Sequence, residues 1–229
     1  SIQKVTSTKA PIFVIFGGAG VGKTTLASEF PAPVFLQTER GEGMLTLDAF
    51  PMIDSLADVH QAIESLANEE HAFQTLVIDS LDHLEPLIWA DVCKRERVES
   101  LEKIGFGKGF AFALDDWRKL FDGLEYLRDK KGMTIVLIAH SKKVRVEDPG
   151  LESYDQTILK LHKNAAPLVV EKADLVLYAK HDIRIKKEEQ GFGSTRTRGI
   201  STGRRILQTS ETPAAVAKNR YNLPLEIEL

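Results

Sequence analysis

A glycine-rich string from Gly17 to Thr24 constrains the fold of this chain more than any other part of its sequence. It reads Gly-Gly-Ala-Gly-Val-Gly-Lys-Thr, a full match to the Gly-x-x-x-x-Gly-Lys-Ser/Thr phosphate loop. Glycines let consecutive backbone N–H groups turn inward around a phosphate, and a helix expected to open at about Lys23 adds its positive dipole end. We therefore predict nucleotide binding, the alternative being a tight strand-to-helix turn. The expected phosphate-binding residues are Gly17, Gly18, Ala19, Gly20, Val21, Gly22, Lys23, Thr24 and Thr25.

The end of this loop and the end of a later apolar run together predict a Mg²⁺ site. Lys23 would reach the β- and γ-phosphates, and the Thr24 hydroxyl would ligate the ion. The apolar run Thr75–Ile78 leads into Asp79, whose carboxylate would hold the same ion through water. No Asn-Lys-x-Asp motif for guanine occurs, so ATP is the expected nucleotide.

Two more polar residues follow apolar runs and are candidates for hydrolysis. Glu39 comes just after the run Val34–Gln37, and it would face the γ-phosphate if that strand neighbours the Asp79 strand. His140 ends the run Thr134–Ala139 and would sense the γ-phosphate from the same sheet edge. The alternatives are a solvated loop carboxylate and a structural histidine. Neither His140 nor any other histidine shows zinc-ligand spacing.

Apolar runs alternate with helical patterns, which predicts an α/β fold with a mostly parallel sheet and helices on both faces. Helices are expected over Leu56–Asn68, capped by Ser55 and Asp58, and over Leu114–Arg128, where apolar residues recur every three or four positions. The expected strands are Pro11–Phe16, Val34–Gln37, Thr75–Ile78, Thr134–Ala139 and Leu175–Tyr178. The stretches that fit neither period are Arg95–Phe112, Ser141–Lys163 and Lys186–Arg205.

The composition is that of an ordinary soluble globular protein, with 229 residues of which 43% are hydrophobic and 28% charged. No linker interrupts the chain, so we expect one α/β domain over residues 1–229. Cys93 is the single cysteine and cannot form an internal disulfide. Without a membrane-spanning run or the apolar region of a signal peptide, a cytoplasmic location is expected.

These motifs, in this order, resemble the RecA-like branch of P-loop ATPases over about residues 12–224. The chain is similar in particular to the compact RecA-core ATPases encoded by phages, some of which are single-strand annealing recombinases. The resemblance implies a RecA-like core with a C-terminal β-hairpin region, and DNA-stimulated hydrolysis of ATP with Mg²⁺. It also implies single-stranded DNA and further copies of the chain as partners, in a filament or ring. A single-strand-binding protein is a further candidate partner.

The C-terminal string Ala217–Pro224 looks like the Lys-Asn-Lys segment of RecA. By this resemblance Lys218 and Arg220 would act in trans, neutralising transition-state charge at the nucleotide of a neighbouring subunit. On sequence alone they are two surface cations. The chain has only about ten residues before its first strand and no large C-terminal domain, so annealing or a helper role is expected rather than strand exchange.

The same family places DNA-facing loops in the first and second irregular stretches. Glycines there give the backbone mobility, lysines could neutralise phosphates, and phenylalanines could stack on bases. A flexible loop with its aromatic rings in the core is the alternative for the first stretch, and the second is only mildly basic. The expected DNA-binding residues are Lys103, Phe106, Lys108, Phe110, Lys142, Lys143 and Arg145.

The net charge of −3 hides an uneven distribution. Residues 1–90 carry 4 basic and 12 acidic residues, whereas residues 91–229 carry 26 and 21. The most basic segment, Lys180–Arg205, includes Arg196, Arg198, Arg204 and Arg205, and its alternation around Gly191–Gly193 predicts a hairpin. This hairpin would form either a phosphate-binding face or a solvated edge protected by lysines.

The leading hypothesis is an ATPase that binds single-stranded DNA in an ATP-dependent oligomer and promotes annealing or recombination. One rival is a small-molecule or nucleotide kinase, which would need an arginine-bearing lid and an acceptor pocket. Another is a nucleotide-switched binding module with little turnover, for which Glu39 is the discriminating residue. A ring-helicase motor is possible within the same fold.

Overall fold

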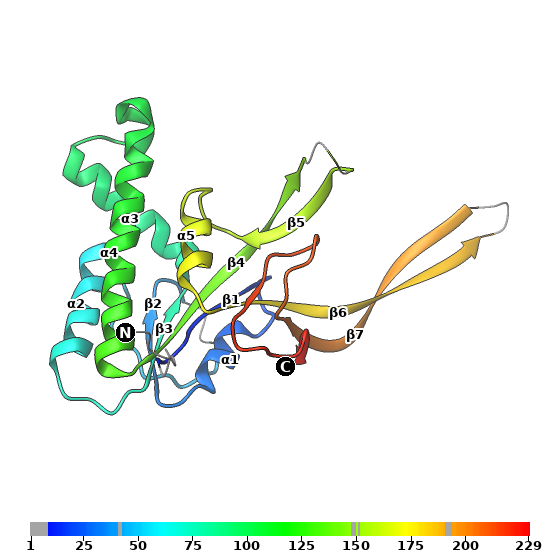
Figure 1. Ribbon diagram of the computed structural model, residues 1–229, viewed down its shortest axis with the longest axis horizontal. Coiled ribbons are helices and arrows are strands. Elements are labelled where there is room, and N and C mark those ends of the chain that lie inside the picture. Colours follow the sequence, from blue (N-terminus) through cyan, green and yellow to red (C-terminus); the bar gives the residue numbers. More distant parts are fainter. Residues whose placement is uncertain (1–8, 41–42, 148–149, 151, 191–193) are drawn as a thin grey trace, which may run out of the picture.

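The computed structural model describes residues 9–40, 43–147, 150, 152–190 and 194–229, and for residues 184–190 and 194–201 only the backbone. Within this part of the chain, nine strands form one mixed sheet in the order β2-β3-β4-β1-β6-β7-β9, with β5 paired to β4 and β8 to β6 (Figure 1). The strands are β1 Ile12–Gly17, β2 Pro33–Gln37, β3 Thr75–Asp79, β4 Thr134–Val146, β5 Tyr154–Leu159, β6 Leu175–Gln190, β7 Ser194–Gln208, β8 Lys218–Asn219 and β9 Glu226–Glu228. The α-helices are α1 Lys23–Ser28, α2 Leu56–Asn68, α3 Leu81–Glu96, α4 Lys108–Lys131 and α5 Ala165–Lys172.

The centre of the sheet is parallel, which confirms the predicted α/β fold. Strands β2, β3, β4, β1 and β6 run in one direction, so their carboxyl ends share one edge. In this register Gly17 lies beside His140, and Asp79 lies beside Gln37. The second strand therefore neighbours the Asp79 strand, as the position predicted for Glu39 requires. Ligands of open α/β sheets bind at this carboxyl edge.

Helices cover both faces of the sheet because successive residues of each central strand point to opposite sides. On β1, Val14 belongs to the core under α2, α3, α4 and α5, whereas Ile15 belongs to the core under α1 and the C-terminal segment. Most side chains of these central strands are buried on either face, which explains why the strands read as continuous apolar runs rather than as alternating ones. The phosphate loop is thus anchored on a strand that is packed on both sides.

Helix α2 has the predicted bounds, while α4 begins earlier than its apolar stripe indicated. The helix starts at Lys108 instead of Leu114, and its first turn packs on the 3₁₀ turns η1 (Leu101–Lys103) and η2 (Gly105–Gly107), of which Leu101 belongs to the main core. A Cβ atom at Gly109 would collide with the carbonyl of Leu101, so this close approach requires glycine. Much of the stretch predicted as irregular is therefore helical.

The prediction of irregular structure was also wrong for the second and third stretches, which form two β-ribbons. Strand β4 continues from Ala139 to Val146 and pairs with β5, and β6 pairs with β7 over almost its whole length. Both ribbons project from the body of the molecule (Figure 1). On β4 and β5 outside the core most side chains are intermediate or exposed, so no apolar run marks them as strands.

The hairpin predicted around Gly191–Gly193 is present as the β6–β7 ribbon. Its turn residues lie outside the described residues, as do the side chains of Arg196 and Arg198. Arg204 and Arg205, nearer the core, are described; Arg204 Nε pairs with Glu228 of β9 at 3.0 Å.

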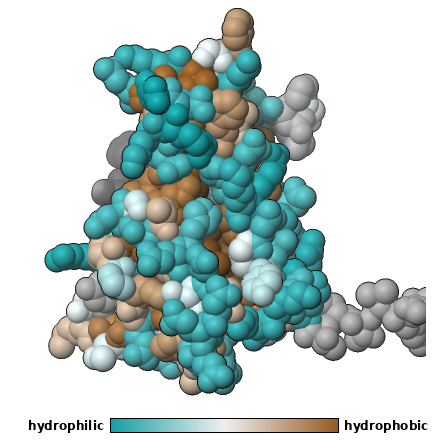
Figure 2. All heavy atoms as spheres, turned by 90° about the vertical axis from the view of Figure 1, so that its left-hand side faces the viewer, coloured by the Kyte–Doolittle hydropathy of each residue, from teal (hydrophilic) through white to brown (hydrophobic). Residues whose placement is uncertain are grey.

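Figure 2 shows the side of the molecule that carries the helices. Hydrophilic residues cover most of this side, and hydrophobic residues gather in patches between the hydrophilic ones. Helix α4 has a buried face of Trp117, Leu120, Phe121, Leu124 and Leu127, and most of its charged residues lie on the other side. Asp116 is buried and pairs with Arg95 and Lys119. Within the described part of the chain, no helix combines the length and apolar character that a membrane crossing requires.

The capping box of α2 gives a direct test of the local structure. The Ser55 side chain accepts a hydrogen bond from the Asp58 N–H at 3.2 Å, and the Asp58 carboxylate accepts one from the Ser55 N–H at 2.9 Å. Replacing Ser55 with Ala leaves the Asp58 amide without its partner and should lower the free energy of unfolding by about 1 kcal/mol in urea titrations. Ser65→Ala within the same helix is the control, and an equal loss there would contradict a capping role.

Candidate nucleotide-binding site

The phosphate loop lies between β1 and α1 and takes the backbone conformation that its glycines permit. Gly20 and Gly22 have φ angles of 72° and 96°, in the left-handed region that favours glycine. A Cβ atom at Gly22 would also collide with the Arg205 guanidinium, which approaches from β7. The positive φ angles and the close approach of Arg205 thus both favour glycine in the segment that the sequence motif assigns to phosphate binding.

Lys23 lies within the loop rather than in solvent. Its Nζ donates to the Gly18 carbonyl at 2.9 Å and lies 3.4 Å from the Gly17 carbonyl, and only 7% of the residue is exposed. Burial lowers the pKa of this amine, and the carboxylates of Asp79, Asp82 and Glu39 oppose the shift. This buried cation lies among carboxylates and donates to backbone carbonyls, so it is well placed to donate to phosphate oxygens instead.

The predicted magnesium ligands are in direct contact. The Thr24 hydroxyl donates to Asp79 Oδ2 at 2.7 Å, although the two residues are 55 positions apart. Asp79 is 5% exposed; burial raises the pKa of its carboxyl, against the hydrogen bond from Thr24. A hydroxyl and a carboxylate on adjoining elements are the oxygen donors that Mg²⁺ takes beside a phosphate. The residues therefore fit this ion, which would neutralise phosphate charge when bound.

Glu39 is held near the phosphate loop by bonds between the ends of β2 and β3. The Thr38 N–H donates to the Asp79 carbonyl and the Ser80 N–H donates to Thr38 Oγ1, each at 2.8 Å. The Ser80 hydroxyl then donates to Glu39 Oε1 at 2.7 Å. This places a partly buried carboxylate in the same cavity as Lys23.

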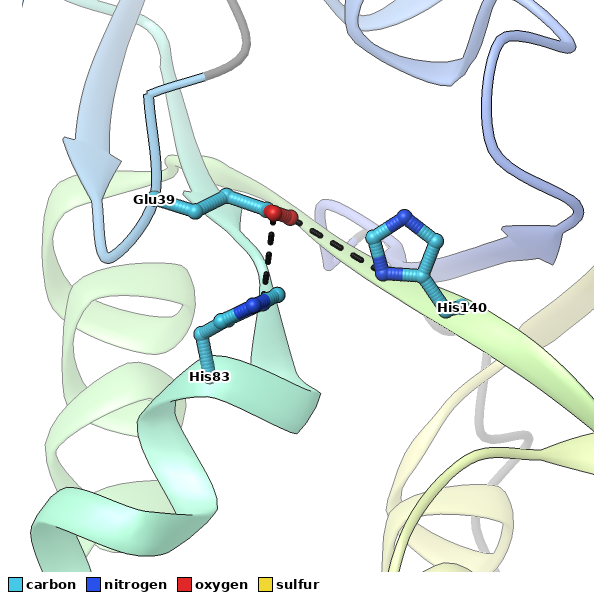
Figure 3. Close-up of side chains that lie close together, drawn as sticks. All are labelled: Glu39, His83 and His140. Carbon is cyan, nitrogen blue, oxygen red and sulfur yellow. Dashed lines mark ion pairs between the residues drawn. The ribbon is translucent and has the colours of Figure 1, made fainter.

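Figure 3 shows Glu39 between two histidines that come from different elements. His83 Nδ1, on the first turn of α3, is 3.3 Å from Glu39 Oε2, and His140 Nδ1, on β4, is 3.8 Å from Glu39 Oε1. Sequence reasoning selected Glu39 and His140 but missed His83, because nothing in the spacing of an exposed helical histidine indicates that it faces two other strand ends.

Asp82 holds His140 in place and was also missed. Its carboxylate accepts a hydrogen bond from the His140 N–H at 2.9 Å and lies 3.0 Å from His140 Nδ1. Burial opposes its ionisation, but these bonds and the charge of His140 keep the pKa of Asp82 below its usual value. The sequence held a signal for Asp82, since this residue lies in the first turn of the helix that directly follows the Asp79 strand.

The cavity over the phosphate loop has a volume of about 560 Å³, within the range of small-molecule sites. Its walls come from the phosphate loop, the ends of β2 and β3, His140 on β4, and β7. Arg205 contributes a cation that sequence reasoning had assigned to the basic hairpin instead. The lining residues include Lys23, Thr24, Glu39, Asp79, His140 and Arg205.

A protein-family model described as "AAA domain" matches residues 9–221 of this chain. The chain belongs to the AAA domain family. A comparison with curated protein sequences finds no match. Together with the phosphate loop on a mostly parallel α/β sheet, the family supports a P-loop NTPase and suggests ATP hydrolysis, for which ATP and Mg²⁺ are the usual ligands.

Lys218 and Arg220 of this AAA domain lie away from its own phosphate loop. Strand β8 pairs with the start of β6, at Leu175 and Val176, whereas Gly17 lies beside Ala179 farther along the same strand. Lys218 Nζ donates to the carbonyls of Val170 and Glu171 at the end of α5, and Arg220 pairs with Asp174 at 3.0 Å. Lys218 and Arg220, the two fingers predicted to reach the nucleotide of a neighbouring subunit, thus lie at the opposite edge of the sheet. Their role in trans stays a prediction.

Some of the predicted DNA-binding residues of the AAA domain are exposed to solvent, whereas others already contact neighbouring residues. Phe106 is fully exposed, with a positive φ of 59°, and Lys108 and Lys143 are exposed. In contrast, Lys103 pairs with Glu99, Lys142 Nζ donates to the Leu161 carbonyl, Arg145 pairs with Asp155, and Phe110 stacks on His162 with ring centroids 4.3 Å apart.

Glu85, one turn after Asp82 on α3, predicts a measurable pH dependence of stability. Both carboxylate oxygens accept from the His162 N–H, and burial raises the pKa to about 7 from 4.5. The folded protein therefore holds an extra proton between these pH values, and stability falls as pH rises through this window. The Glu85→Gln variant should gain about 3 kcal/mol relative to wild type between about pH 5 and about pH 8. The free energy of unfolding of both proteins is measured by denaturation at a series of pH values. An equal change with pH in the two proteins would contradict the raised pKa of Glu85.

Proposed function

We propose that this chain is an ATP-dependent single-stranded-DNA-binding protein of the RecA-like class. In this proposal the residues form a single ATPase domain, ATP binds between subunits, and the assembly promotes annealing or homologous recombination. Its motifs resemble those of the compact annealing ATPases of phages, which supports this proposal. Lys23 and Thr24 hold the nucleotide with Mg²⁺, Asp79 shares the ion, Glu39 orients water and His140 senses the γ-phosphate.

The continuity of β4 carries the proposal. One strand runs from the buried core through His140 into the β4–β5 ribbon, where Lys143 is exposed and Arg145, also exposed, pairs with Asp155 of β5. The residue that faces the nucleotide and the residues that would meet a DNA backbone are thus separated by a few positions on one extended segment. Occupancy of the nucleotide site is thereby linked to the placement of a basic arm.

Helix α3 supplies a second connection between the site and both candidate DNA segments. Asp82 contacts His140, Glu85 accepts from the His162 N–H, and Trp89 packs edge-on against the rings of Phe110 and His162. Because Phe110 begins α4 and His162 follows β5, their stacked rings join the first segment to the second. This assigns Phe110 to coupling and leaves Phe106 and Lys108 as the groups free to meet bases and phosphates.

The positions of the C-terminal cations favour action in trans. About 13 Å of strand separates the Leu175 end of β6 from the phosphate-loop end, and Lys218 and Arg220 lie at the former. A cation there is suited to the nucleotide of an adjoining subunit rather than its own. Head-to-tail contacts of this kind build rings or filaments.

Retention of single-stranded oligonucleotides tests the coupling. Wild type should retain them on a filter only with ATP and Mg²⁺. Lys23→Ala should lose nucleotide affinity by about tenfold or more, since a buried charge-assisted contact is removed, and should lose retention with it. Lys172→Ala, on the opposite edge beside Glu125, is the matched lysine control. Retention that is indifferent to nucleotide and to Lys23→Ala would contradict the proposal.

Subunit mixing tests the fingers. Lys23→Ala and Lys218→Ala proteins should each have low ATPase activity, because one lacks a nucleotide site and the other a finger. Mixed in equal amounts, they should recover activity at about a quarter of their interfaces, where an intact site meets an intact finger. ATP binding by isolated Lys218→Ala protein checks that it is folded. If that variant binds ATP and joins oligomers but mixing restores nothing, Lys218 does not act in trans.

A further inference from the structure

Glu39, His83 and His140 bring one carboxylate and two imidazoles together at the mouth of the phosphate loop. One ligand atom from each lies within 4.8 Å of the others. The three residues come from the end of β2, the start of α3 and β4, so the cluster exists only in the folded chain (Figure 3). This explains why the histidine spacing gave no sign of it.

The donor set selects a class of metal. Magnesium takes oxygen ligands, whereas imidazole nitrogens together with a carboxylate suit first-row transition ions, zinc foremost. Ligands at about 2 Å from a tetrahedral ion lie about 3.3 Å apart. The two pairs measured from Glu39, at 3.3 and 3.8 Å, are already close to this spacing.

The surroundings favour a cation and hold the ligands in place. Asp82 Oδ2 adds a second carboxylate 3.0 Å from His140 Nδ1, and its negative charge favours a cation beside this imidazole. The Ser80 hydroxyl contacts both Glu39 Oε1 and His83 Nδ1, at 2.7 and 2.9 Å. The His83 side chain is 42% exposed, so an ion can approach from solvent.

We propose that Glu39, His83 and His140 form a Zn²⁺ site that inhibits hydrolysis of ATP. An ion bound there engages the Glu39 carboxylate and removes it from the attacking water, while the fourth zinc position remains for water or a phosphate oxygen. The inhibition rests on the proposed function, whereas binding of the ion does not. The site is separate from the Thr24–Asp79 oxygens that fit Mg²⁺.

His83 distinguishes this site from the magnesium site because it belongs only to the former. The His83→Gln variant keeps a polar group near Ser80 but loses the imidazole ligand. His60, exposed on α2 and outside the cluster, gives the matched control His60→Gln. Zinc binding is measured without nucleotide, by competition of purified protein with a chromophoric chelator. ATPase rates are then measured with Mg²⁺ in excess over a series of buffered free Zn²⁺ concentrations.

Wild type and His60→Gln should bind one equivalent of zinc, and His83→Gln should bind it more than tenfold more weakly. The zinc concentration for half-inhibition, relative to each protein's own zinc-free rate, should shift by the same factor. Equal binding by His83→Gln, or equal inhibition of it, would overturn the proposal and indicate zinc at the magnesium ligands. Zinc binding that depends on His83 in a protein without ATPase activity would leave the metal site standing but overturn its regulatory role and the proposed function.

Discussion

The register of the central parallel strands is the constraint on which the rest of this structure depends. Because β1, β4 and β3 are aligned in one direction, the phosphate loop, His140 and Asp79 reach the same edge of the sheet. A slip by one residue would turn every side chain of a strand to the other face and would separate Thr24 from Asp79. The packing on both faces excludes such a slip, so the precision of the candidate site is a property of the core.

The parts that sequence could predict are those in which local pattern and tertiary position coincide. The phosphate loop is one, since its glycines serve a local backbone conformation; Asp79, Glu39 and the bounds of α2 are others, because strand ends and a capping box mark them. Sequence missed side chains brought in from elsewhere, such as Asp82, His83 and Arg205. It also missed the β4–β5 ribbon, whose pairing satisfies backbone groups without an apolar face.

Acidic and basic residues of this AAA domain differ in burial as well as in their position along the chain. The acidic first part supplies buried or partly buried carboxylates around Lys23, where each is matched by a hydroxyl, an amide or an imidazole. Several basic residues of the second part instead pair with carboxylates close by, as Arg220 does with Asp174. These basic side chains therefore already have acidic partners, which the count of charges along the sequence does not show.

Strand β4 changes partners without a gap. His140 is the last residue paired with β1, and Ser141 is the first paired with β5. A loop at this junction would absorb a displacement by changing its torsion angles, but a strand held in ladders on both sides of the junction resists both compression and bending. The ribbon is consequently joined to the central sheet without an intervening loop, and a change in the direction of β4 at His140 would turn the ribbon with it.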